Sequence, residues 1–348
     1  MPVKEYPLVP LFEKFIRYSA KGKRLKPDGS RIRPQTITNY RYVLRYLEEY
    51  EQRSGTTIRI RPVAAANKRL ITAEQGYWKK FYLEFTTYLY QERECYDNYV
   101  GSVIKVIRIF FNFLEKDLCM ATGNFHRLFY VRKEEVPIVT LMPQQLQFLI
   151  GDAQFDSALT TSLRKTKDIF IFGCSVALRV SDLFAIRFSD IEEVSGQFYL
   201  PVTSIKTSTA VRIKLPAYCM EIIGRFRVMA KGRKTIFPPI PLSRFNAHIK
   251  EIAGMAGWTQ EVRKQRTRRG VSITTSGKPV RFCDMVSSHT MRRTAITTML
   301  MLGMKEHVVK KISGHADDSK SFYRYVNLVQ SYLDNEMDNV FNKLAEVA

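Results

Sequence analysis

The chain has 348 residues, 45% of them hydrophobic, which is enough to bury two cores of ordinary size. Its 55 Lys and Arg residues outnumber its 33 Asp and Glu residues, giving a formal net charge of +22. A surplus of this size attracts polyanions, so it favours nucleic acid or an anionic membrane surface as a partner, with solubility alone as the alternative explanation.

The sequence argues against a membrane or secreted protein. Its most apolar stretch, residues 100–114, is interrupted by Lys105 and Arg108 and is too short to span a bilayer. The N-terminus lacks the apolar segment of a signal peptide. The five cysteines are widely spaced without a Cys-x-x-Cys pair, which disfavours a disulfide framework or a zinc ribbon. We therefore expect a cytoplasmic protein.

Apolar spacing predicts helices in the first part of the chain, at about residues 37–47, 78–90 and 98–114. Phe81 and Phe85 recur at helical spacing, which favours a role in the core over base stacking. Arg41 and Arg45 share a separate face of the first predicted helix. Residues 126–137 are charged and end in a proline, so we expect the domain linker there.

Two strongly basic segments are candidates for contact with phosphates. Residues 19–34 are polar, contain Gly and Pro, and have only Asp28 as an acid, so we expect an exposed basic loop. Residues 262–270 form a second basic cluster within a predicted short ribbon at about 261–281. The alternative for both is a solvated surface. The predicted DNA-binding residues are Lys21, Lys23, Arg24, Arg41, Arg45, Arg263, Lys264, Arg266, Arg268 and Arg269.

The second half combines helices with a small sheet. Pro143 suits the first turn of a helix, and residues 167–187 alternate at helical spacing. From residue 197 to 215 the period changes to two, which predicts a β-hairpin or a three-stranded sheet with Lys206 near a turn. Helices resume at about Ser288, with breaks at Gly303 and Gly314.

Residues suited to phosphoryl transfer are scattered over this half. Arg179 and Arg292 are permanently charged and able to bind two phosphate oxygens each. His289 and His315 are able to move a proton at neutral pH. A tyrosine has a usual pKa of about 10 and needs such neighbours to become a nucleophile. A metal site is disfavoured, since His307 has no cysteine partner and no convergent carboxylates nearby.

The order and wording of these segments resemble the tyrosine recombinases, or phage-type integrases, and in particular mobile-element integrases of Bacteroides-like bacteria. Residues 177–182 resemble the first arginine box of the family, and residues 289–293 the second. By this resemblance Lys206 is the hairpin lysine that acts as a general acid, and Asp182 supports Arg179. Lys214 is the fallback for the lysine, although its strand pattern is that of an exposed residue.

The resemblance assigns the nucleophile less directly. Both Tyr323 and Tyr325 follow His315, and the usual gap in the family lies between the two. We favour Tyr325, because residues 321–325 match the Ser-Phe-x-x-Tyr wording of related integrases. The predicted catalytic set is therefore Arg179, Lys206, His289, Arg292, His315 and Tyr325, with no metal and no cofactor.

The resemblance also implies a fold and a function. The fold is mainly α with a small β-sheet: a SAM-like helical core DNA-binding domain (1–125), the linker 126–137, a catalytic domain (138–330) and a helical tail (331–348). The tail docks on a neighbouring protomer or packs on its own domain. The expected function is site-specific recombination of double-stranded DNA through a 3′-phosphotyrosine, without metal or ATP.

The expected assembly is a homo-tetramer on paired sites, with a DNA-bending accessory protein as a further partner. Two alternatives stay open: strand relaxation of the type IB topoisomerase kind, and a non-catalytic basic DNA-binding regulator. The sequence leaves the DNA target undecided, and it does not separate an integrase from a resolvase of chromosome dimers.

Overall fold

The computed structural model describes residues 4–63, 68–203, 210–262, 265–274, 280–316 and 319–329, together with 334, 337–338 and 341. The contacts of the chain divide it into two compact units. Unit 1 is Met1–Val136 with Lys264–Gly277, and unit 2 is Pro137–Arg263 with Lys278–Ala348. The fold is mainly helical with small sheets, which confirms the predicted class.

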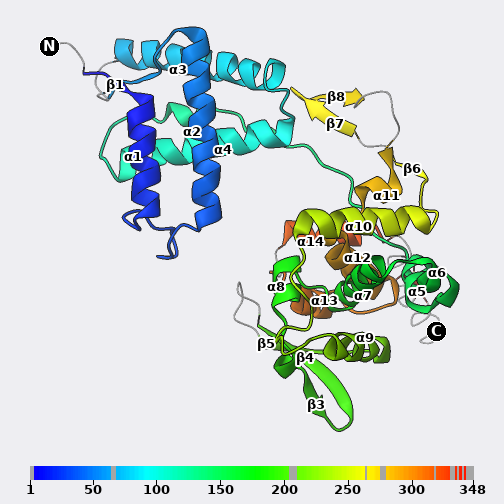
Figure 1. Cartoon of the computed structure of the whole chain (residues 1–348). Coiled ribbons are helices and arrows are strands. Elements are labelled where there is room, and N and C mark those ends of the chain that lie inside the picture. The colour runs from blue at the N-terminus through cyan, green and yellow to red at the C-terminus, as the bar shows by residue number, and fades with distance from the viewer. Residues whose placement is uncertain are drawn as a thin grey trace. The chain divides into compact units, whose positions relative to one another are not determined.

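Unit 1 is a helical domain with two small two-stranded pairings (Figure 1). Its elements are β1 (Tyr6–Pro7), α1 (Leu8–Ala20), α2 (Pro34–Ser54), β2 (Arg59–Ile60), α3 (Lys68–Gln91), α4 (Asp97–Lys116), η1 (Phe125–Leu128), β7 (Gln265–Arg268) and β8 (Val271–Thr274). The three helices predicted in this half are confirmed as α2, α3 and α4, each longer than its apolar pattern indicated.

The core of unit 1 is largely aromatic. Phe12 and Phe15 of α1 pack against Phe110 of α4 with ring centroids 4.8 and 5.9 Å apart. Phe81 and Phe85 of α3 stack at 5.3 Å and are at most 5% exposed. These aromatic rings belong to the core, as their spacing predicted. α2 begins with Pro34 at its first position and is capped at its C-terminus by Gly55, whose φ of 62° suits a residue without a Cβ atom.

Unit 2 surrounds the helix α7, which is buried along most of its length. Its elements are α5 (Pro143–Gly151), α6 (Ala153–Ala158), α7 (Thr161–Val176), α8 (Val180–Ala185), η2 (Phe188–Asp190), β3 (Glu192–Val194), β4 (Gln197–Thr203), β5 (Ala210–Lys214), α9 (Ala217–Val228), α10 (Leu242–Met255), β6 (Glu261–Val262), β9 (Val280–Arg281), α11 (Phe282–Met285), α12 (Ser288–Met301), α13 (Glu306–Ser313) and α14 (Lys320–Val326).

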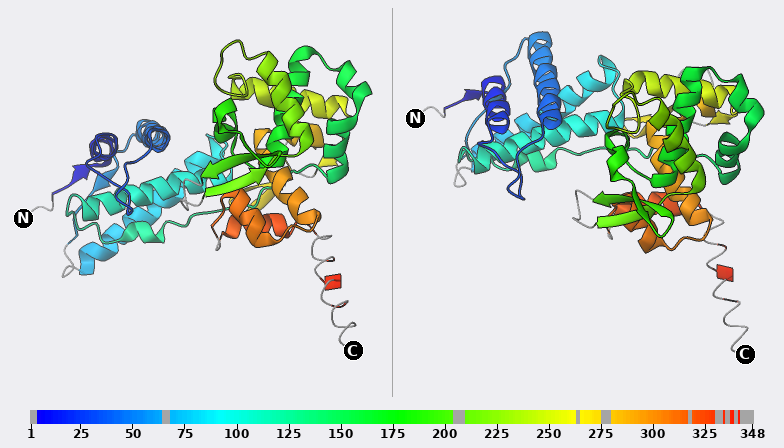
Figure 2. Two further views of the ribbon diagram at one scale, coloured as in Figure 1. Left: turned by 90° about the horizontal axis from the view of Figure 1, so that it is seen from below. Right: turned by 60° about the horizontal axis from the view of Figure 1, so that its bottom comes forward.

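The sheet predicted from the period-two pattern is the antiparallel sheet β3–β4–β5. It lies at an edge of unit 2, where β5 contacts α13 (Figure 2). The ribbon predicted near residues 261–281 is also present, as the antiparallel pairs β6–β9 and β7–β8. No helix in the described part of the chain is both long enough and apolar enough to cross a bilayer.

A close approach of α7 and α12 positions the site described below. Gly173 of α7 faces Met291 of α12, and a Cβ atom on Gly173 would clash with the methionine side chain. The missing side chain lets the two helices pack closely, with Met291 fully buried. This packing brings the residue after Met291, which is Arg292, next to the end of α7.

Candidate active site

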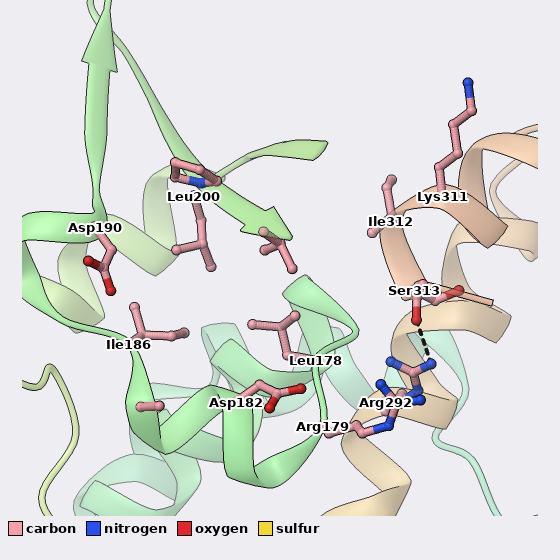
Figure 3. A pocket seen from close by; sticks show the side chains of 14 residues that line it. Leu178, Arg179, Asp182, Ile186, Asp190, Leu200, Arg292, Lys311, Ile312 and Ser313 are labelled. Atoms are coloured by element: carbon pink, nitrogen blue, oxygen red, sulfur yellow. Dashed lines mark hydrogen bonds between the residues drawn. The ribbon is translucent and has the colours of Figure 1, made fainter. Parts of the chain in front are cut away.

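A turn between α7 and α8 presents the first arginine box. α7 ends at Val176, and Ala177 takes the left-handed conformation with φ of 55°, which is unusual for a residue with a Cβ atom. Arg179 then forms the N-cap position of α8, one turn before Asp182. Both side chains line a cavity of about 290 Å³, together with Arg292 (Figure 3).

Arg292 connects three of the predicted segments through its guanidinium group. It is only 4% exposed. Its Nη1 donates to the Ala177 carbonyl oxygen at 2.8 Å, and its Nη2 donates to the Ser313 carbonyl oxygen. Nη2 also lies 3.4 Å from Nδ1 of His315. The buried arginine therefore holds the first box against the segment that carries His315.

The charge of the cavity is strongly positive where the two arginines meet. Burial, and then the charge of Arg179, lower the pKa of Arg292 to about 10, while Tyr325 and Asp182 oppose the shift. Arg292 therefore stays charged at neutral pH, at a cost in electrostatic energy that a bound anion would relieve. Of the five N–H groups of Arg292, two bind the carbonyl oxygens of Ala177 and Ser313, and three others are left to bind an anion.

Ser313 fixes the ring of His315. The serine hydroxyl has one proton, and its shortest contact is to the Val309 carbonyl oxygen at 2.6 Å. Its oxygen therefore accepts from Nδ1 of His315 at 2.8 Å, and the neutral imidazole has its lone pair on Nε2. The sequence analysis did not identify Ser313. Its only signal in the sequence is its place two residues before a box histidine.

The two candidate nucleophiles lie in different surroundings. Tyr325 is 6% exposed, and its ring centroid is 6.0 Å from that of His315. Tyr323 is 46% exposed, and its hydroxyl is 3.5 Å from Nζ of Lys310, which also lies over its ring. Tyr325 therefore faces the predicted site residues, and Tyr323 faces a lysine outside the predicted set.

His289 and Arg293 lie one helical turn apart on α12. Partial burial, and then the charges of Arg293, Arg292 and Arg179, lower the pKa of His289, so its imidazole is neutral at pH 7. Burial also lowers the pKa of Arg293, and the nearby Tyr325 opposes that shift. Arg293 was not predicted as a site residue, although it directly follows Arg292 in the second box.

The predicted lysine cannot be placed in the same way. Lys206 lies outside the described residues, in the segment between β4 and β5. Leu200, Pro201 and Val202 of β4 line the cavity beside Arg179, so the strand that leads toward this segment borders the site. The fallback, Lys214, is exposed near the end of β5 and is paired with Tyr199 across the sheet.

The structure describes most, but not all, of the residues predicted to bind DNA. Lys21, Lys23, Arg41 and Arg45 are exposed in unit 1. Arg24 is half-buried, with its guanidinium 4.9 Å from the Phe15 ring centroid, so it also contributes to packing. Arg263 and Lys264 lie outside the described residues.

Three other arginines of the predicted basic cluster have partners within the protein. They are Arg266, Arg268 and Arg269, which contact a carboxylate, a backbone carbonyl and a hydroxyl of unit 1, respectively. The basic composition of the segment did not predict these contacts. DNA contact by these residues stays a prediction. Within the described residues, no three His, Cys, Asp or Glu side chains come together as a metal site requires.

Comparison with known proteins identifies the family. The model of the phage integrase family matches residues 154–331, which contain both arginine boxes, both predicted histidines of the site and both candidate tyrosines. The chain belongs to the phage integrase family. It is a tyrosine-type site-specific recombinase, an enzyme that breaks and rejoins DNA strands.

Solved structures of two integrases are similar in fold. A lambda integrase dimer bound to a COC′ core site is 14% identical, with 92% of this chain and 77% of that chain covered and a TM-score of 0.54. The Tn1549 transposon integrase in complex with circular intermediate DNA is also 14% identical, with 92% and 94% covered and a TM-score of 0.58. A comparison with curated proteins finds no match.

Proposed function

We propose that this recombinase cleaves DNA with Tyr325 as its nucleophile. The observation that supports this most directly is the contrast in burial between the two tyrosines. Tyr325 lies close to His315 and influences the pKa of both Arg292 and Arg293, whereas Tyr323 is exposed beside Lys310. A nucleophile has to reach a phosphate that the site arginines hold, and Tyr325 is the tyrosine near them.

The reaction assigns a role to each site residue. Arg179 and Arg292 bind the non-bridging oxygens of the scissile phosphate, where charge increases in the transition state. The Tyr325 oxygen attacks phosphorus, its proton passes to His289 or His315, and the bond from phosphorus to the 5′ oxygen breaks. Lys206 donates a proton to the leaving 5′ oxygen. The 3′-phosphotyrosine ester conserves the energy of the broken bond, so no ATP is needed.

Because Arg292 is buried, nearby charged groups rather than water stabilise its positive charge. Asp182 lies in the same cavity and opposes the lowering of its pKa. We assign Asp182 the role of orienting the arginines rather than moving a proton. With His289 kept neutral by the surrounding arginines, the site holds a proton acceptor next to fixed cations, as attack by a tyrosine requires.

We further propose that the cytoplasmic protein acts as a homo-tetramer on paired sites in double-stranded DNA, assisted by a DNA-bending accessory protein. The net charge of +22 and the exposed Lys21, Lys23, Arg41 and Arg45 support duplex binding. A lambda integrase tetramer bound to a Holliday junction has a similar fold, with a TM-score of 0.58 and 15% identity. Met337 of the tail is 55% exposed and Phe341 is 56% exposed, which suits docking of the tail on a neighbouring protomer.

A nicked suicide substrate tests the assignment of the nucleophile. The wild-type protein should become trapped on this DNA as a denaturant-resistant adduct, also in EDTA. Tyr325→Phe should bind the DNA and form no adduct, because only the hydroxyl is removed from a ring that keeps its packing. Tyr323→Phe is the matched control and should form the adduct. DNA attached to Tyr323 in peptide mapping would overturn the assignment.

A further inference from the structure

The β7–β8 ribbon crosses from one half of the chain to the other. Residues 265–274 follow unit 2 in sequence, yet their contacts place them in unit 1. The ribbon lies beside the end of α3 and the start of α4 (Figure 1). The chain therefore passes between the units three times, after Val136, after Arg263 and after Gly277.

The tip of the ribbon is held by a buried carboxylate. Arg269 and Gly270 both have positive φ, 55° and 81°, as in a type I′ turn, so their N–H groups point to the same side. Both donate to the side chain of Asp97, at 2.9 and 2.8 Å, and Asp97 is only 2% exposed. The Tyr90 hydroxyl donates to the same carboxylate.

These donors keep Asp97 ionised. Burial alone would raise the pKa of Asp97, but hydrogen bonds from Tyr90, Thr267, Gly270 and Arg269 outweigh it and lower the pKa. Without the ribbon the carboxylate would lose its N–H donors at a buried position. The N–H groups at the tip of the ribbon therefore complement the negative charge of Asp97.

A second carboxylate holds the side of the ribbon. Glu134 is 8% exposed, and its Oε1 accepts from both Nε and Nη2 of Arg266, at 2.8 and 2.7 Å. The backbone N–H of Thr267 donates to the other oxygen of Glu134. Asn98 fixes Glu134 in turn, through two hydrogen bonds to its backbone at 2.9 and 3.1 Å.

Arginine contacts complete the docking. The guanidinium groups of Arg266 and Arg268 lie 4.1 and 5.1 Å from the centroid of the Tyr96 ring. Arg268 donates to the Glu94 carbonyl oxygen at 2.8 Å. The interface is thus built from charged hydrogen bonds rather than from a large apolar surface. An interface of this kind is specific in geometry and is able to open without exposing a hydrophobic core.

We propose that the ribbon is a latch: the chain enters it from unit 2 and returns from it to unit 2, so its docking on α3, α4 and Glu134 of unit 1 restrains both of these passages of the chain. Residues 135–138, at the first passage of the chain between the units, contain neither helix nor strand, so with the ribbon undocked this irregular segment is the shortest connection between them. Two DNA-contacting units on a short tether bind one duplex with a higher effective concentration than units on a long one. The consequence for DNA rests on the proposed function, whereas the docking itself does not.

Hydrogen exchange of the full-length protein tests the latch directly. In the wild type, amides within residues 265–274 should exchange slowly. In Asp97→Asn the side chain carries no charge, and its NH2 group cannot accept a hydrogen bond from a backbone N–H. The backbone amides of residues 265–274 should therefore exchange about 10- to 100-fold faster, the factor expected for loss of a charge-assisted hydrogen bond. Asp117→Asn, at the exposed end of the same helix, is the matched control and should exchange as the wild type does.

Arg266→Ala opens the latch from the ribbon side and leaves α4 unchanged. Both variants should bind full-length duplex sites about 10-fold more weakly and cleave them more slowly, with the same circular dichroism spectrum as the wild type. Unchanged exchange in Asp97→Asn, or faster exchange with wild-type affinity and cleavage, would overturn the latch. A wild-type protein that fails to bind DNA would contradict the proposed function instead, and the exchange rates would then decide the docking alone.

Discussion

Arg292→Lys separates the charge of the second box arginine from its geometry. Lysine keeps the positive charge but has one nitrogen, whereas Arg292 binds two carbonyl oxygens with two nitrogens. Losing one charged hydrogen bond costs about 1.5–3 kcal/mol, and the unpaired buried carbonyl adds about 1–3 kcal/mol. Together these costs predict that the free energy of unfolding falls by about 2.5–6 kcal/mol.

The same substitution should affect the reaction more than binding. An ammonium group has three N–H donors on one nitrogen and lacks the planar fork with which a guanidinium reaches two carbonyl oxygens and a phosphate at once. Loss of one donor to the phosphate typically costs about 10²–10³-fold in rate. Urea unfolding and cleavage of the suicide substrate measure the two effects. Arg293→Lys is the control and should lose less than about 1 kcal/mol. Wild-type stability of Arg292→Lys would refute the structural role assigned to its two hydrogen bonds.

Three further predictions concern the proton transfers and DNA binding. Because the pKa of His289 is lowered, its imidazole stays neutral below the usual value of about 6.5, so the cleavage rate should stay level down to that pH and decline only below it. His289→Gln should lose this decline if His289 is the base, and an unchanged pH profile would point to His315. Lys206→Ala should suppress cleavage but not binding, and a substrate with sulfur at the 5′ leaving position should restore it; failure to restore it would remove Lys206 from the role of acid. If the two basic segments supply about 6–10 phosphate contacts, affinity should fall about 10³–10⁵-fold between 50 and 200 mM salt, and a flat filter-binding titration would contradict this.

The sequence predicted the helices well where one face of a helix is buried. In α2, α3 and α4 the apolar residues recur at helical spacing because those positions form the aromatic core. The ends of these helices were less predictable, since they depend on local features such as Pro34 and Gly55. The β3–β4–β5 sheet was predictable for the same reason, from a period of two.

Contacts between distant segments were not predictable from local patterns. The basic composition of residues 265–274 indicated a DNA-contacting surface, but it carries no information about carboxylates more than 130 residues earlier in the chain. Asp97 and Glu134 look like ordinary acidic residues in sequence, and only the fold shows that both are buried and bind the ribbon. The close approach of Gly173 to Met291 was hidden in the same way, because each residue is unremarkable in its own helix.

Ser313 shows what such hidden contacts contribute to the site. Its hydroxyl joins the Val309 carbonyl oxygen to Nδ1 of His315, and its own carbonyl oxygen accepts from Arg292. Ser313→Ala removes only the hydroxyl, so the free energy of unfolding should fall by about 1 kcal/mol. His315 would lose the partner that sets its tautomer, and cleavage should slow by about 10–100-fold, as for loss of a group that orients a functional histidine.

Ser313→Thr is the matched variant, because it keeps the hydroxyl at the same position and should retain most of the rate. Ser319→Ala, in the segment before α14, is a control at a half-buried serine whose partner is the hydroxyl of Ser321. Suicide-substrate kinetics and urea unfolding compare the three variants. If Ser313→Ala cleaved as fast as the wild type, the serine would have only a structural role, and Nδ1 of His315 would not need a fixed partner for the reaction. A slow Ser313→Ala with a fast Ser313→Thr would instead identify the hydroxyl itself as the group that positions His315 beside Tyr325.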